Sequence, residues 1–183
     1  INSLEIEIDN AIVDLLALQQ PVAIDLRLIL AAAKINKDLE RIGDHAVNIA
    51  ESALAVCQTR PEEPLLDLPM MAELTKKMLR SALDSFIHND PRMSKTVLTV
   101  DDQVDELNMK MTTEMMGLIR KDVSLIDGGM QLIRVSRNLE RVADLTTNIA
   151  EEVIFITEAR VVKHHAADDA LSKPKENESA EKH

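Results

Sequence analysis

Glutamate and aspartate recur with the same spacing at two places in this chain. Residues 39–51 (LERIGDHAVNIAE) and 139–151 (LERVADLTTNIAE) are identical at eight of thirteen positions, at an offset of 100 residues. Each segment carries one acidic pair four residues apart: Glu40 with Asp44, and Glu140 with Asp144. On a helix this spacing brings two carboxylates to one face, and their hard oxygen atoms suit Mg²⁺, Mn²⁺, Ca²⁺ or iron. The repeat therefore predicts two carboxylate metal sites.

A metal ion needs more ligands than one helical turn supplies, and a further acidic pair offers them. Asp101 and Asp105 are also four residues apart, in the segment that precedes the second repeat. If the two helices pack side by side, four carboxylates line one groove. In the first half, residues 1–4 align with residues 104–107, which puts Asn2 in the place of Asp105 and the equivalent of Asp101 before residue 1. We therefore expect the first site to be incomplete.

A solvated helix face crossed by salt bridges is the main alternative interpretation. Acidic residues four apart on a helix repel each other by about 0.2–0.5 kcal/mol. Nearby cations could offset this repulsion: Lys37, Arg41, Arg137 and Arg141. Surface salt bridges add little stability. Because the acids keep their type and spacing in both copies while flanking residues differ, we favour metal binding.

Catalytic arrangements have weaker support. A ferritin-type di-iron site needs Glu-x-x-His, but Gly43 and Ala143 stand at the histidine positions. His45 is not repeated, and Cys57 has no repeated histidine or aspartate companion. We expect no enzyme. A carboxylate-bridged hydrolase or oxidase and a purely structural helical adaptor are the alternatives.

The composition predicts an all-α protein that positions these acids. The 183 residues include four glycines, two phenylalanines and neither Trp nor Tyr, which argues against β-sheet, whereas good helix formers dominate. Apolar spacing and the prolines predict helices near residues 4–15, 22–56, 70–88, 92–121 and 125–164. At 100° per residue, the repeated acids lie opposite the apolar stripe and point outward.

The repeat also predicts the domain organisation. The second half contains three helices and the first half two, so we expect an equivalent of the 70–88 helix to precede Ile1. The architecture is then two tandem three-helix bundles, the first lacking its N-terminal helix in this chain. The predicted parts are a first bundle (1–58), a linker (59–69), a second bundle (70–165) and a disordered tail (166–183).

The charge balance excludes several classes of protein. The chain has 21 Lys and Arg against 32 Asp and Glu, a net charge of −11. Nucleic-acid binding needs a surplus of positive charge, which is missing. No apolar run reaches the roughly 18–20 residues of a membrane span. The lone cysteine cannot form an internal disulfide.

The two E-R-[IV]-[GA]-D-x-x-x-N-I-A-E segments resemble the PhoU family, the phosphate-specific transport system accessory proteins. Residues 20–27 (QPVAIDLR) and 101–105 (DDQVD) support the resemblance, which covers most of residues 1–163. It implies paired three-helix bundles that hold multinuclear metal clusters on E(D)-x-x-x-D pairs. Carried over, the ligand candidates are Glu40, Asp44, Asp101, Asp105, Glu140 and Asp144. Residues that could assist them are Glu5, Asp9, Asn48 and Asn148.

The resemblance further implies a function. It implies a cytoplasmic regulator that represses the phosphate-starvation response. Such a regulator contacts the ATPase subunit of the phosphate ABC transporter and the sensor histidine kinase of the two-component pathway. Iron, zinc, manganese and magnesium all stay open as the bound metal, and a homodimer stays open as the assembly.

Overall fold

The computed structural model describes residues 1–59 and 67–159, which form five α-helices and one 3₁₀ turn. The elements are α1 (Asn2–Gln19), α2 (Ala23–Thr59), α3 (Asp67–His88), α4 (Pro91–Lys121), η1 (Val123–Leu125) and α5 (Ile126–Glu158). The described residues contain no strand, so the all-α prediction is confirmed. The predicted tail (166–183) and most of the predicted linker (59–69) lie outside the described residues.

Local sequence signals account for the helix ends around α4. Pro91 opens the helix, where its missing N–H costs nothing, and the Asp90 carboxylate accepts a hydrogen bond from the Arg92 backbone N–H at 3.0 Å. After Lys121 the carboxylate of Asp122 accepts from the Ser124 backbone N–H at 2.9 Å and starts η1. These caps produce the tight turn that returns the chain into α5.

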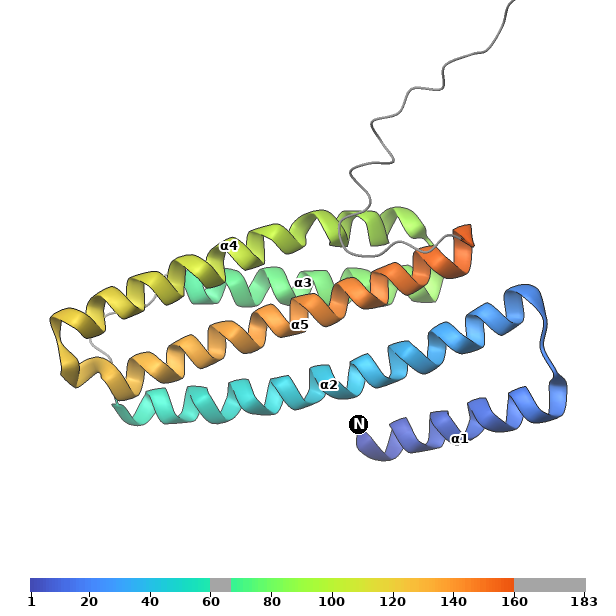
Figure 1. Ribbon diagram of the computed structural model, residues 1–183, viewed down its shortest axis with the longest axis horizontal. Coiled ribbons are helices and arrows are strands. Elements are labelled where there is room, and N and C mark those ends of the chain that lie inside the picture. Colours follow the sequence, from blue (N-terminus) through green and yellow to red (C-terminus); the bar gives the residue numbers. More distant parts are fainter. Residues whose placement is uncertain (60–66, 160–183) are drawn as a thin grey trace, which may run out of the picture.

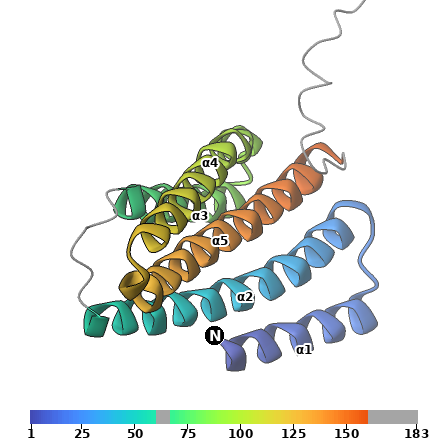
Figure 2. The same ribbon diagram turned by 60° about the vertical axis from the view of Figure 1, so that its left-hand side comes forward.

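The helices pack so that α5 is the centre of the molecule. α5 lies between α4 and α2, α3 packs on both α4 and α5, and α1 packs on α2 (Figures 1 and 2). α2 and α5, which carry the two repeated segments, run antiparallel. Lys34 meets Glu152 at 2.6 Å, and His45 meets Asn138 at 2.8 Å. The second half of the chain is thus a three-helix bundle, and the first half adds a helix pair to its α5 side.

The core follows this arrangement. α5 contributes sixteen buried residues, whereas α1 contributes none. The centre of the core is formed by side chains from four helices: Ile35, Ile42, Met71, Met78, Val104, Met111, Val142 and Ile149. The apolar side chains of α1 lie largely at the surface, for example Leu4, 59% exposed, and Ile6, 62% exposed. α1 is therefore the helix held least firmly by apolar packing.

Candidate metal site

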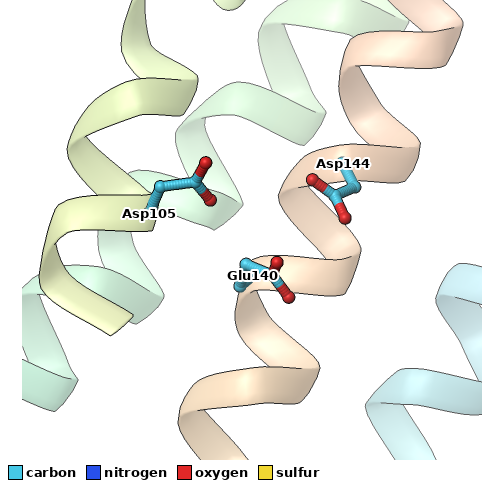
Figure 3. Close-up of side chains that lie close together, drawn as sticks. All are labelled: Asp105, Glu140 and Asp144. Carbon is cyan, nitrogen blue, oxygen red and sulfur yellow. The ribbon is translucent and has the colours of Figure 1, made fainter. Parts of the chain in front are cut away.

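Three carboxylates meet between α4 and α5 in the second half of the chain. Asp105 comes from α4, and Glu140 and Asp144 come from successive turns of α5 (Figure 3). Each residue offers one oxygen atom, and these oxygen atoms all lie within 4.8 Å of one another. Asp105 is exposed, whereas Glu140 and Asp144 are half-buried. We call this group the α4–α5 acidic cluster.

The packing of α5 places two of these carboxylates. Leu139, Val142 and Ala143 are buried in the core, so the residues on the other side of that turn point toward α4 and solvent. One turn before Glu140, the Ser136 hydroxyl donates a hydrogen bond to the Asn108 side-chain oxygen of α4 at 2.7 Å. This bond sets the level of α4 beside α5, and Asp105 lies one turn before Asn108.

The electrostatics of the cluster favour a cation. Burial raises the pKa of Glu140, and the carboxylates of Asp144 and Asp105 raise it further against the lowering effect of Arg141. Arg141 lies 2.9 Å from an Asp144 oxygen and 3.6 Å from a Glu140 oxygen. Arg137 also lowers the pKa of Glu140, but the net shift is upward, so the charged form of this carboxyl is disfavoured and a divalent ion would stabilise it.

The arginine contacts that the salt-bridge interpretation requires differ between the two halves. Arg141 bridges the acids of its own segment, whereas its equivalent, Arg41, lies 3.7 Å from Asp38. The arginine contacts therefore differ between the two halves, although the acidic pair is the same. Three close carboxylates, two of them from half-buried residues, are also a donor set that fits a hard divalent cation.

In the first half, Glu5 of α1 lies near the part of α2 that carries Glu40 and Asp44. Partial burial raises the pKa of Glu40, and the carboxylates of Asp44 and Glu5 raise it further, with a side-chain hydrogen bond between Glu40 and Asp44. Sequence alignment pointed to Asn2 and hence to an incomplete site. Glu5, one turn further along α1, is the α1 carboxylate that acts on Glu40. Among the described residues, however, carboxylate oxygens that all lie within 4.8 Å of one another are found at the α4–α5 acidic cluster and not at Glu5, Glu40 and Asp44. The incomplete first site therefore stays a prediction.

The remaining candidates lie in varied surroundings. Asp101 is buried, 8% exposed, and lies outside the α4–α5 acidic cluster. The Asp9 carboxylate accepts a hydrogen bond from Asn36 at 2.9 Å. Asn48 is half-buried on α2, and Asn148 is exposed on α5. The repeated acids are thus half-buried at helix contacts, apart from the exposed Asp44, and do not all point outward into solvent.

Two residues of the site were not found from the sequence. Asn36 and Ser136 occupy equivalent positions, 100 residues apart, four residues before Glu40 and Glu140. Each is buried and bonds to the neighbouring helix. The signal available was that both are polar and lie one turn before the repeated glutamate, on the same side of the helix. Because one is asparagine and the other serine, a comparison of identical residues between the two halves does not find them.

Together, this fold and these clusters define a class of protein: an all-helical protein of repeated units with carboxylate groups at equivalent helix contacts. A family model described as the PhoU domain matches residues 1–53 and 68–153. The chain belongs to the PhoU family. No helix among the described residues is long and apolar enough to cross a membrane.

Relatives with this name cover most of the chain. The phosphate-specific transport system accessory protein PhoU homolog of Aquifex aeolicus is 40% identical over 164 residues, 90% of this chain and 74% of the relative. The homolog of the same name from Clostridium acetobutylicum is 33% identical over 163 residues, 88% of this chain and 74% of the relative.

Solved structures have the same fold. The crystal structure of PhoU from Pseudomonas aeruginosa superposes with a TM-score of 0.84 at 33% identity, covering 87% of this chain and 77% of that one. The phosphate transport system regulatory protein PhoU from Streptococcus pneumoniae superposes with a TM-score of 0.79 at 29% identity, covering 89% and 76%. The two solved structures therefore support the all-helical fold.

Proposed function

We propose that this chain is a metal-binding accessory protein of the phosphate-specific transport system that represses the phosphate-starvation response from the cytoplasm. Its membership of the PhoU family supports the link to phosphate transport. The observation that carries the metal-binding part is the α4–α5 acidic cluster, whose three carboxylate oxygens lie within 4.8 Å of one another.

Asp105, Glu140 and Asp144 would hold the ion in the second half, and Glu5, Glu40 and Asp44 in the first. A bound divalent cation would neutralise part of the negative charge of −11 and link two helices at each site. Iron, manganese, magnesium and zinc are candidate ions, and the all-oxygen donor set favours manganese, magnesium or iron over zinc.

The regulatory part of the proposal concerns protein partners. A name that the relatives share, accessory protein, describes action through another protein. We infer contact with the ATPase subunit of the phosphate ABC transporter and with the sensor histidine kinase of the phosphate response. In this role the metal-bound clusters stabilise helix contacts and shape the surface offered to the partner. No step of catalysis is needed.

Metal content tests the first part directly. Protein purified without affinity-tag metal or chelator is expected to contain at least about one divalent ion per chain by elemental analysis. A variant with Glu140→Gln and Asp144→Asn is expected to lose that ion from the second half. The matched control is Asp102→Asn with Glu106→Gln, which removes two exposed carboxylates four residues apart on α4. An unchanged metal content in the first variant would refute metal binding at the cluster.

Partner contact and repression test the second part. We expect the chain to co-purify with the ATPase subunit or with the kinase, and its deletion to release phosphate-controlled genes at high phosphate. The Glu140→Gln, Asp144→Asn variant separates the two parts, because it tests whether repression needs the ion. Normal repression in the deletion strain would rule out the regulatory role.

A further inference from the structure

At equivalent positions in both halves, a buried polar side chain links two helices: α1 to α2 in the first half, and α4 to α5 in the second. In the first half, the Asn36 side-chain amide lies 3.0 Å from the Glu5 backbone oxygen and 2.9 Å from an Asp9 carboxylate oxygen, and donates to both. In the second half, Ser136 donates to Asn108 at 2.7 Å. Asn36 is 7% exposed and Ser136 is fully buried. Both lie one helical turn before the repeated glutamate.

The hydrogen bonds contribute more to helix position in the first half, because α1 and α4 are packed differently. α4 has six buried residues that hold it against its neighbours, whereas α1 has none. The hydrogen bonds of Asn36 are therefore a larger share of what fixes α1 in position. A helix without buried side chains opens at a low free-energy cost unless polar contacts hold it.

The hydrogen bonds of Asn36 lie one helical turn from the repeated acids along α2. Asn36 and Glu40 are four residues apart on α2 and share one face. Since Asn36 bonds to the backbone of Glu5, it fixes the turn of α1 that carries Glu5, whose carboxylate acts on Glu40. The close approach of Ile1 to Gly43, 2.6 Å from the position of an added Cβ, confirms that the two helices run antiparallel at this register.

We propose that Asn36 is a positioning residue for metal binding in the first half: its two hydrogen bonds to α1 hold Glu5 beside Glu40 and Asp44. The inference rests on the proposed metal-binding function. Asp9 is, in this arrangement, an acceptor for Asn36 and not a ligand. Ser136 makes the equivalent contact in the second half, where the packing of α4 makes the site less dependent on it.

The test measures each site alone. In a background with Glu140→Gln and Asp144→Asn, Mn²⁺ binding to the first site is titrated by calorimetry, with and without Asn36→Leu. Leucine has the same branched arrangement of side-chain heavy atoms as asparagine but is bulkier and has no donor, so an apolar side chain still fills the site and the hydrogen bonds are lost. We expect Mn²⁺ affinity to fall by about ten-fold or more, the effect typical of removing a residue that orients a ligand. Circular dichroism should show unchanged helix content.

Two controls separate positioning from packing and from ligation. Ser136→Ala, tested in a background with Glu40→Gln and Asp44→Asn, should lower the affinity of the second site by less than about three-fold, well below the orienting-residue range. Asp9→Asn keeps the oxygen that accepts from Asn36 and should leave first-site affinity within about two-fold, whereas loss of a ligand costs more. Hydrogen exchange should show faster exchange of α1 amides in Asn36→Leu and unchanged exchange in α4.

The outcomes are distinguishable. If the chain without substitutions binds no Mn²⁺ at either site, the proposed function fails. If both sites bind but Asn36→Leu leaves first-site affinity unchanged, the positioning role is refuted and metal binding stands. If Asp9→Asn weakens binding as strongly as Asn36→Leu, Asp9 is a ligand and its assignment as an acceptor is refuted. If Asn36→Leu does not fold, Asn36→Ala replaces it with the same expected result.

Discussion

Glu140→Gln is expected to have opposite effects on stability with and without a bound cation. In metal-free protein, the Glu140 carboxyl lies next to two other carboxylates, and burial raises its pKa. Because the folded-state pKa lies above the unfolded one, the ionised form is disfavoured by folding. Glutamine removes that repulsion. Each like-charge pair costs about 0.2–0.5 kcal/mol, so the variant should be more stable by up to about 1 kcal/mol.

With Mn²⁺ the order should reverse. At a free concentration of about 100 times Kd, binding stabilises the unmodified chain by about 2.7 kcal/mol. If the variant binds 100-fold more weakly, its gain at the same concentration is about 0.4 kcal/mol. For a chain of this size, 1 kcal/mol corresponds to about 2–4 °C in Tm. The unmodified chain should therefore gain roughly 5–10 °C and overtake the variant.

Thermal unfolding followed by circular dichroism, in EDTA and then in MnCl₂, measures both differences. The control is Asp102→Asn with Glu106→Gln, for which we expect no reversal because both residues lie outside the cluster. A variant that is less stable than the unmodified chain in EDTA would refute the repulsion argument. An unmodified chain whose Tm does not respond to Mn²⁺ would refute the metal site.

Three further substitutions test the packing described above. Asp38→Asn should raise the free energy of unfolding at pH 7 by up to about 1 kcal/mol, the scale of partly exposed charge interactions. Burial raises the pKa of Asp38 against the lowering effect of Arg41, so folding favours the protonated form; the gain should shrink as pH falls through that pKa. Gly43→Ala should stabilise by about 0.5–1 kcal/mol through helix propensity, since the atom in the way is the flexible end of the exposed Ile1 side chain. Ile149→Ala, at a fully buried position, should cost about 2–5 kcal/mol, and the equivalent Ile49→Ala less, because Ile49 is only half-buried.

Urea titrations at pH 7 and pH 4 measure all three. An Asp38→Asn gain that is the same at both pH values would contradict the assigned cause. Destabilisation by Gly43→Ala would mean that the Ile1 side chain cannot move away from the added methyl group. Equal losses for the two isoleucine variants would mean that the first half is as tightly packed as the second.

Much of the fold could be predicted from the sequence, because helices leave a periodic signal. The prolines and the Asp90–Pro91 step located the start of α4 within one residue. The start of α3 lies at Asp67, three residues earlier than the prolines suggested, because Pro69 is tolerated in the first turn of a helix. The repeated segment located the acids of α2 and α5, because identical residues at a fixed offset of 100 positions can be read from the sequence alone.

The site could be predicted only in part, because the carboxylates contributed by the neighbouring helix depend on how the two helices lie side by side. The alignment of α1 with α4 identified Asn2, whereas the α1 carboxylate that raises the pKa of Glu40 is that of Glu5. Asp105 joined the cluster and Asp101 did not, although both belong to one acidic pair. Which of two residues a turn apart faces a neighbouring helix depends on axial register. The sequence pattern does not contain that register.

The pairing of α2 with α5 determines the order in which the chain can fold during synthesis. The buried residues Ile35 and Ile42 of α2 pack in one core with residues of α5 that are made about 100 positions later. At about 5–20 residues per second, the ribosome needs roughly 5–20 s to supply that partner. During this interval the apolar face of α2 is uncovered, as is that of α1. The nascent chain is therefore most prone to aggregation before α5 emerges, and the long sequence separation of its main contact slows the final folding step.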